Sequence, residues 1–294
     1  MQVTILTLLH LLLPVTIGLC LVGLLCFSLE RLFPARHGAR LLRSGWGTDL
    51  TYAFFTPLVV RVLRRFAIGL ALIPVALIVG HGLHLERLVG GFGPLSRQPW
   101  WLQGLEMVLI ADFLGYWEHR LFHRRALWRI HAVHHSSEQL DWLAAFRVHP
   151  LNDIVGGICK SVPLVALGFT PTVLVGVLPL FTIHAIFLHA NVPWRFGLLR
   201  YAISSPAFHR WHHTAQDEGR DRNFAGLLPI WDLLFGTFYL PAGQPQQFGV
   251  DETLPAGYFA QMIWPFKRSA LPTSAAIAQP FVISPLPKTV RVPH

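Results

Sequence analysis

Histidines gather in short clusters in one part of the chain. Eleven of the 16 histidines lie between positions 119 and 213, in the stretches HRLFH, HAVHH, FRVHP, HAIFLHAN and HRWHH. Residues three or four positions apart share one face of an α-helix. Because imidazole is a frequent ligand of transition metals, this spacing predicts that each cluster directs two or three ligands at a common point. Imidazoles packed together without such a partner would cost desolvation and repulsion.

The number of imidazoles predicts the number of metal ions. The three tightest clusters supply eight imidazoles, and His189 can make a ninth, whereas one transition metal rarely takes more than about six ligands. Two metal ions are therefore expected. The predicted ligands are His119, His123, His131, His134, His135, His189, His209, His212 and His213.

The types of residue narrow the chemistry. The chain has no HExxH motif of a zinc protease, and no Glu is followed by a His three residues later, as in carboxylate-rich di-iron bundles. An imidazole-rich pair of redox metals beside lipid favours oxygen activation on an apolar substrate, although geometry alone also accepts zinc. No catalytic residue beyond the metal ligands is expected.

The elements that must position these histidines belong to a membrane protein. Hydrophobic residues make up 53% of the chain, charged residues 13%, and the mean hydropathy is +0.47. Candidate crossings are residues 3–29, 66–83 and 101–117, and a hairpin of 154–169 and 172–188 that turns at Thr170-Pro171. We expect an all-α multi-pass bundle of about four transmembrane helices, capped by a histidine-rich helical region that holds a dinuclear metal site. The spacing of Arg61, Arg64 and Arg65 favours a helix at the membrane interface.

The basic residues predict the orientation. Arg31, Arg36, Arg40 and Arg43 follow the first crossing, whereas no Lys or Arg precedes it. By the positive-inside rule the amino terminus faces away from the cytosol. Counting crossings from there places the histidine clusters on the cytosolic side. The formal net charge of +9 then fits anionic headgroups and topology, and no nucleic-acid partner is expected.

No redox cofactor domain is visible in the chain. It lacks a GxGxxG turn, a CxxCH haem site and a run of cysteines, since Cys20, Cys26 and Cys159 all lie in apolar segments and form no CxxC pair. Electrons must therefore come from a separate ferredoxin, cytochrome or reductase.

The spaced motifs resemble the fatty acid hydroxylase superfamily of membrane di-iron oxygenases, often called sterol desaturase-like. The resemblance rests on DFLGYWEHRLFH, LWRIHAVHHSSEQLDWLAAFRVHP, FLHAN, SSPAFHRWHHT and NFAGLLPIWDLLFGTFYLP. It implies that the nine histidines bind two iron ions, for which zinc can substitute in purified protein. It further implies hydroxylation or desaturation of a sterol, fatty acyl chain or related lipid, with O₂ and external electrons.

Several residues have open roles. His149 matches an Arg-x-His-Pro element of the family and is either a ligand or a loop cap, and His184 is a weaker candidate. Asp112 lies about two helical turns before His119 and could orient an imidazole or be satisfied within the bundle. The remaining candidates for orienting imidazoles are Glu118, Asp153, Asn191 and Asp232.

Two other functions stay open. One is an ether-lipid (alkylglycerol-type) monooxygenase that uses a reduced pterin, and the other is a membrane metal transporter or storage protein. We expect amino-terminal transmembrane and interfacial helices in residues 1–100 and a catalytic domain in 101–245. An extension in 246–294, poorly ordered from about Lys267, follows.

Overall fold

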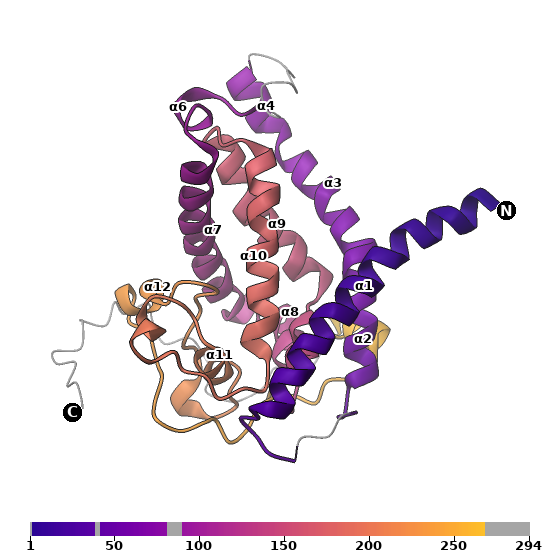
Figure 1. The fold of residues 1–294 in the computed structure, drawn as a ribbon, viewed down its shortest axis with the longest axis vertical. Coiled ribbons are helices and arrows are strands. Elements are labelled where there is room, and N and C mark those ends of the chain that lie inside the picture. The colour runs from indigo at the N-terminus through magenta and orange to yellow at the C-terminus, as the bar shows by residue number, and fades with distance from the viewer. Residues whose placement is uncertain (1, 39–41, 81–89, 268–294) are drawn as a thin grey trace.

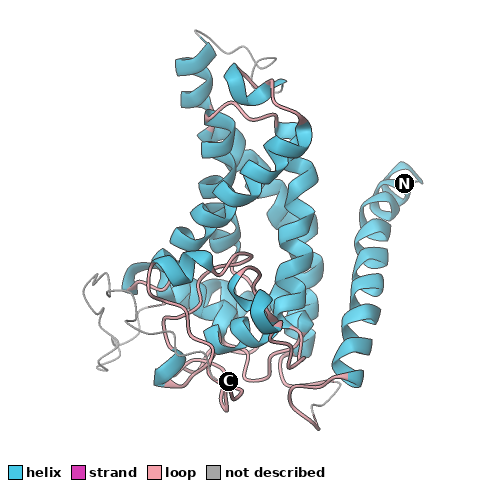
Figure 2. Ribbon diagram, turned by 60° about the vertical axis from the view of Figure 1, so that its left-hand side comes forward, coloured by secondary structure: helices cyan, strands magenta, loops and turns pink. Residues whose placement is uncertain are grey.

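The computed structural model of the protein describes residues 2–38, 42–80 and 90–267. The described chain is helical and contains no β-strand; Thr214 and Phe248 form one isolated bridge. The fold class predicted from the sequence, all-α, is confirmed (Figures 1 and 2). The longer helices are α1 (Gln2–Leu32), α2 (Trp46–Phe55), α3 (Arg61–Ala71), α4 (Ile73–Gly80), α7 (Trp100–Phe122), α8 (Arg125–His135), α9 (Pro150–Ala166) and α10 (Pro171–His189). The shorter ones are α6 (Gly93–Ser96), α11 (Pro206–His212), α12 (Ile230–Leu234) and α13 (Tyr258–Ile263), with 3₁₀ turns at Trp142–Phe146 (η2), Gly197–Tyr201 (η3), Asp217–Gly219 (η4) and Trp264–Phe266 (η5).

Helices α7, α9 and α10 run side by side and form the centre of the bundle (Figure 1). Helix α9 ends at Ala166 and α10 begins at Pro171, where a proline fits because the first helical N–H needs no partner within the helix. The predicted hairpin turn is thus confirmed. A buried apolar cluster joins the three helices and consists of Met107, Ala111, Leu164, Phe169 and Leu174.

Two helices are long and apolar enough to cross a membrane, Leu12–Leu32 and Pro171–His189. Only 11% and 17% of their apolar windows are buried inside the protein, whereas the core helix of a soluble protein would be mostly buried. Leu21, Leu24 and Leu25 are each more than 60% exposed. These features indicate a membrane protein. The number of about four crossings is not confirmed, because α9 has 17 residues and α7 carries Glu106, Asp112 and Glu118.

The segment expected to hold an interfacial helix and the second crossing differs from the prediction. Residues 51–66 are shared between α2, a π-helical turn at Thr56–Val60 (η1) and α3. Pro57 lies within that turn and cannot donate a backbone hydrogen bond to a regular α-helix. Arg64 Nη1 pairs with Asp153 Oδ1 of α9 at 2.9 Å, so α3 packs against the bundle. The predicted crossing is interrupted after Ala71, and residues 81–83 lie outside the described residues.

Helix α1 stands at the side of the bundle (Figure 2). Gly23 of α1 lies so close to the Trp142 ring of η2 that an added Cβ would come within 2.9 Å of it. Glu30, near the end of α1, accepts hydrogen bonds from the backbone N–H groups of Trp142 and Asn191, each at 2.9 Å. Helix α1 is therefore fixed to two segments that follow histidines of the clusters, one after His135 and one after His189.

Candidate metal centre

The structure brings the nine predicted histidines together in two groups. Within each group, one ring nitrogen of every histidine lies within 4.8 Å of those of the others. Site A consists of His119, His123, His131, His135 and His212, and site B consists of His134, His189, His209 and His213. The sites adjoin, because the rings of His135 and His213 stack with their centroids 4.3 Å apart. Each site could hold a metal ion; metal binding by the nine residues stays a prediction.

The histidine clusters divide between the two sites according to helical geometry. In HAVHH on α8, the residues four apart, His131 and His135, join site A, whereas His134 joins site B. In HRWHH on α11 the outer pair joins site B and the middle histidine joins site A. Residues four apart are rotated by about 40° on a helix, whereas the residue three along points about 60° to the other side. One helix can therefore serve two metals.

In site A, the hydrogen bonds place the imidazole protons so that unprotonated ring nitrogens face one another. His119 Nδ1 donates to the Phe224 carbonyl at 2.8 Å, and His131 Nδ1 donates to Asn152 Oδ1 at 2.6 Å. A neutral imidazole has one proton, so both Nε2 atoms carry lone pairs, although they are only 3.1 Å apart.

Site B shows the same arrangement. His134 Nδ1 donates to the Arg147 carbonyl at 3.0 Å and His189 Nδ1 to the Ala185 carbonyl at 2.7 Å, yet the two Nε2 atoms lie 3.2 Å apart. Two lone pairs at this distance repel unless a cation lies between them. Ligands about 2.1 Å from a metal are separated by about 3.0 Å in an octahedron and about 3.4 Å in a tetrahedron. The observed separations thus fit a metal in each site.

Burial keeps these imidazoles neutral. Burial above all, and then the neighbouring imidazoles, lower the pKa of His131, His134 and His135 well below the ordinary value. The same causes act on His212 and His213. Neutral imidazole is the form that binds a metal.

A loop that the sequence analysis did not single out orients much of site A. His123 Nδ1 donates to Asp221 Oδ1 at 2.9 Å, and His212 Nδ1 donates to the Arg222 carbonyl at 2.8 Å. The Phe224 carbonyl holds His119. Residues 221–224 thus fix three of the five rings of site A. Asp221 and Asn223 have positive φ angles of 54° and 59°, which Asp and Asn tolerate better than other non-glycine residues.

Buried polar groups hold this loop in place. Asp232 accepts hydrogen bonds from the backbone N–H groups of Phe224 and Ala225, both at 2.8 Å, and from Thr237 Oγ1 at 2.6 Å. Asn223 Nδ2 donates to the Phe208 carbonyl at 2.9 Å, which links the loop to α11. Asp232, one of the candidates for orienting an imidazole, contacts no imidazole in the structure; it holds the backbone of Phe224, whose carbonyl bonds to His119.

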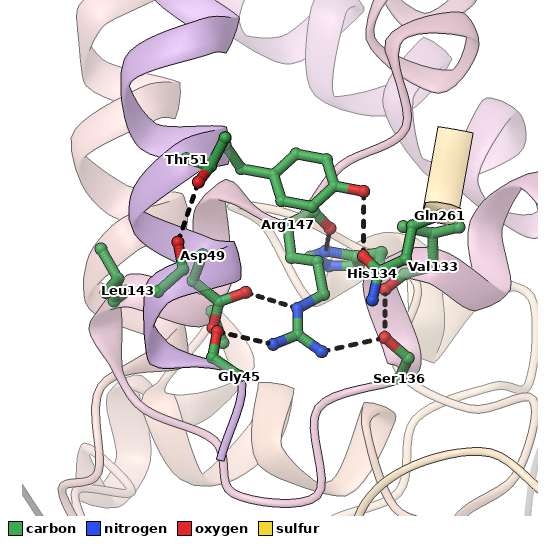
Figure 3. A network of polar contacts seen from close by, with 12 residues as sticks. Gly45, Asp49, Thr51, Val133, His134, Ser136, Leu143, Arg147 and Gln261 are labelled. Atoms are coloured by element: carbon green, nitrogen blue, oxygen red, sulfur yellow. Dashed lines mark hydrogen bonds and ion pairs between the residues drawn. The ribbon is translucent and has the colours of Figure 1, made fainter. Parts of the chain in front are cut away.

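A buried ion network supports His134 from the other side (Figure 3). The backbone carbonyl of Arg147 accepts the hydrogen bond from His134. The side chain of Arg147 pairs with Asp49 through Nε and donates a hydrogen bond to Ser136 Oγ at 3.1 Å. Arg43 joins Asp49 at 2.6 Å and forms a two-pronged pair with Asp141 at 2.6 and 2.7 Å. The start of α2 is thereby tied to the loop that orients a site B histidine.

The histidines with open roles lie outside both sites. His149 is the N-cap of α9, where its Nδ1 accepts from the Leu151 N–H at 3.2 Å, and its Nε2 donates to the Met262 carbonyl. This geometry is that of the loop cap rather than of a ligand. His184 belongs to neither site, and its buried Nε2 has no hydrogen-bond partner among the described residues.

The polar candidates hold the scaffold instead of contacting the imidazoles. Asp112 accepts from the Leu227 and Leu228 N–H groups at 2.8 Å and from Trp231 Nε1 at 3.0 Å, so it is satisfied within the bundle. The Asn191 amide bonds to the backbone N–H and carbonyl of Arg36. Glu118 accepts from Asn152 Nδ2 at 3.3 Å and reaches His131 only through that amide, and Asp153 pairs with Arg64 instead.

Comparison with known proteins agrees with the histidine pattern. The sequence model of the fatty acid hydroxylase family matches residues 104–237. An ornithine lipid hydroxylase of Rhizobium tropici is 33% identical over 173 residues, which are 57% of this chain and 52% of that protein. The alkylglycerol monooxygenase of Danio rerio is 34% identical over 170 residues, 58% of this chain and 36% of that protein.

A very-long-chain aldehyde decarbonylase of Oryza sativa subsp. indica is 31% identical over 140 residues, 43% of this chain and 22% of that protein. The chain thus matches about half or less of the length of these relatives. No solved structure matches it. The family match over residues 104–237 and these relatives support placing this part of the chain in the fatty acid hydroxylase superfamily.

Proposed function

We propose that this protein is a membrane-bound dinuclear oxygenase that uses O₂ and external electrons to hydroxylate or desaturate an apolar lipid. The observation that carries the proposal is the pair of adjoining sites in which nine imidazoles converge. Their Nε2 lone pairs face one another at 3.1–3.2 Å. The catalytic segment is expected within residues 101–245.

Iron is the metal that suits this reaction. When bound, a pair of iron ions supplies O₂ activation and removal of hydrogen from an unactivated C–H bond, whereas zinc has no redox chemistry. The chain contributes the imidazoles and buries the sites away from water. It fixes the proton of six of the nine on Nδ1, through carbonyl, amide and carboxylate acceptors. Five ligands in site A and four in site B leave coordination positions free, since such metals take up to about six.

An apolar groove beside α1 suits the substrate chain. It has a volume of about 260 Å³ and lies between α1, α2 and η2, where Leu24, Phe54 and Trp142 are among the lining residues. The turn η2 leads from this groove to Arg147, whose carbonyl holds the site B ligand His134. In this proposal Trp142 lines the entrance for the lipid chain. Phe146 packs instead into the core cluster around Tyr52 and Val133.

The names of the relatives indicate the class of substrate. One relative hydroxylates ornithine lipids and another is a monooxygenase of alkylglycerols, so an amphiphilic lipid with a long apolar chain is the substrate class we propose. The alkylglycerol branch keeps the ether-lipid reaction with a reduced pterin as the second candidate. In the first candidate, a separate ferredoxin, cytochrome or reductase supplies the electrons.

Metal transport is the candidate from another class. A transport site is expected near the middle of the spanning helices, along a path through them. The described histidine groups instead involve the last residue of α10, His189, and the carboxyl ends of α7 and α8. The position of the two groups therefore favours an oxygenase at the end of the bundle.

Metal analysis tests the oxygenase. The protein would be expressed in iron-rich medium, purified without oxygen in mild detergent, and examined by elemental analysis and Mössbauer spectroscopy before and after exposure to O₂. We expect about two irons per chain and a spectrum that changes with O₂. Redox-inert metal under these conditions, or unchanged binding after His134 and His212 are both replaced by Ala, would contradict the proposal and favour transport or storage. If the two irons are found, lipid analysis of producing cells would identify the product.

A further inference from the structure

One imidazole of the metal centre is connected to the protein surface by a single hydrogen bond. His123 of site A has a side chain that is 5% exposed, and its Nδ1 donates to Asp221 Oδ1 at 2.9 Å. The Asp221 side chain is 64% exposed. Among the described residues, Asp221 is the only carboxylate bonded to a histidine of either site.

The other imidazoles whose Nδ1 atoms form hydrogen bonds have carbonyl or amide partners instead of a carboxylate. His134 and His189 donate to carbonyls of buried or helical backbone, and His131 donates to the Asn152 amide. His212 donates to the carbonyl of Arg222, an exposed residue that directly follows Asp221. Two of the site A imidazoles, His123 and His212, are thus bonded directly to the exposed residues 221–222.

Positive charge surrounds this point. Partial burial raises the pKa of the Asp221 carboxyl, but the hydrogen bond from His123 and the charges of Arg124 and Arg220 outweigh it and hold the pKa below its ordinary value. Arg222 and Arg125 are exposed. Arg220 also pairs with Asp217 at 3.4 Å and Asp251 at 3.2 Å, and these carboxylates offset part of its positive charge.

We propose that Arg124, Arg125 and residues 220–222 form the docking surface for an acidic one-electron carrier protein, and that Asp221 and His123 conduct its electrons into site A. The inference rests on the proposed oxygenase function. Each docking oxidises one carrier and reduces the centre by one electron. Two such events, with one O₂ and two protons, balance the conversion of a C–H bond to C–OH with release of one water.

Charge reversal tests the docking surface. A reduced plant-type [2Fe–2S] ferredoxin, an acidic carrier, would be mixed with the iron-loaded, oxygen-free protein, and reduction of the centre followed by stopped-flow absorbance. The double variant Arg125→Glu/Arg222→Glu should be reduced at least about tenfold more slowly at low salt, with the difference shrinking as salt rises. Reduced methyl viologen, a small cation, should not be slowed. Arg97→Glu, an exposed arginine just after α6 at the opposite end of the bundle (Figure 1), is the matched control and should behave like the wild type.

Variants of Asp221 test the route. Asp221→Asn retains an oxygen that accepts the His123 hydrogen bond, whereas Asp221→Ala removes it. We expect the Asn variant to be reduced by ferredoxin at about the wild-type rate and the Ala variant about tenfold more slowly. Because Asp221 also orients His123, both variants would be compared with the wild type at equal iron content, where Asp221→Ala should slow reduction by methyl viologen much less than reduction by ferredoxin. If Asp221→Ala slows both reductants equally at equal iron content, Asp221 only positions His123 and the route is wrong.

A binding measurement separates this inference from the proposed function. Oxidised ferredoxin binding to the protein in nanodiscs needs no redox metal, and Arg125→Glu/Arg222→Glu should weaken it at least about tenfold. A double variant that binds as tightly as Arg97→Glu would overturn the docking surface even if the centre holds iron. A centre that takes up no redox metal, with ferredoxin binding still dependent on the arginines, would contradict the oxygenase and leave the surface supported.

Discussion

The chemistry of each histidine depends on the group bonded to its second nitrogen. Four of the rings described above donate Nδ1 to a backbone carbonyl and one donates to an amide oxygen. Each such bond fixes the tautomer and the ring orientation before any metal arrives. At the scale of residues, the centre is therefore preorganised by partners that carry no metal-binding signature of their own.

Removal of a single site B ligand should affect the metal content selectively. His134 is one of only four imidazoles in site B, so we expect His134→Ala to lower the metal content from about two ions per chain to about one. Elemental analysis of purified protein checks this. His149→Asn is the control, because His149 lies outside both sites and Asn also caps helices. Full metal content in His134→Ala would show that this imidazole is not a ligand.

Asp232 should influence metal affinity without contacting a histidine. Its carboxylate holds the backbone of Phe224 and Ala225, and Phe224 in turn orients His119. Loss of groups that orient ligands typically costs about 10–100-fold in metal affinity, and we expect a loss in that range for Asp232→Ala. Competition with a chelator measures it. Unchanged affinity in a folded Asp232→Ala protein would mean that residues 221–224 hold their position without this carboxylate.

At the scale of elements, the buried ion network determines where α2 begins. Gly45 precedes α2 with a φ of 80°, a conformation that costs other residues about 1–2 kcal/mol. A Cβ at this position would also collide with the Arg147 guanidinium. Arg147 is thus surrounded by Asp49, Ser136 and the Gly45 backbone (Figure 3), which leaves no space for a side chain at position 45.

Substitution of two neighbouring glycines should have opposite effects. We expect Gly45→Ala to lower the free energy of unfolding by about 2 kcal/mol or more, from the positive φ and the displaced Arg147. Gly47→Ala should be neutral or stabilising by up to about 1 kcal/mol, since it lies within α2 with nothing within 4 Å of the added Cβ. Thermal unfolding in detergent compares the two. Equal midpoints would show that the network tolerates a shifted Arg147.

The same network should be sensitive to loss of its central carboxylate. Asp49 is fully buried between Arg43 and Arg147, and removal of one partner of a buried ion pair typically costs about 3–5 kcal/mol. We expect Asp49→Ala to be destabilised by this amount in chemical unfolding of the purified protein. Thr51→Ala on the exposed side of α2 is the control. Similar stabilities of the two variants would contradict a structural role for the network.

At the scale of the whole molecule, the apolar helices and the histidine sites divide the protein into two parts. Exposed leucines cover α1, and α10 is mostly unburied, whereas both sites are enclosed by buried polar residues at the ends of the helices. This division is expected when one part faces lipid and the other faces water, because unpaired polar groups are costly in hydrocarbon.

The orientation in the membrane remains a prediction from the basic residues after α1. If the histidine end faces the cytosol, a cysteine placed at the exposed Glu218 should react with an impermeant maleimide only after intact cells are opened. The native cysteines would first be replaced by Ser. A cysteine at Gln2, at the predicted outer end, is the matched control and should react in intact cells. Labelling of the Glu218 position in intact cells would reverse the proposed topology.

The sequence by itself determined the helical class, the hairpin turn before Pro171 and the nine residues of the two sites. These features depend on local rules: residues four apart share a helix face, proline begins a helix, and long apolar stretches form helices in a membrane. The i, i+4 pairs of each cluster indeed point to a common site. Local spacing therefore carried most of the information about the ligands.

The tertiary structure alone decided which histidines share a site and what orients them. His134 joins His189 and His209 across three different elements, a combination that depends on how α8, α10 and α11 pack. The roles of Asp221, Asp232 and Arg147 arise from backbone carbonyls, loop conformation and buried charge pairs between distant segments. Such contacts leave no periodic signal in a sequence, because any residue provides a carbonyl and only the fold brings it to an imidazole.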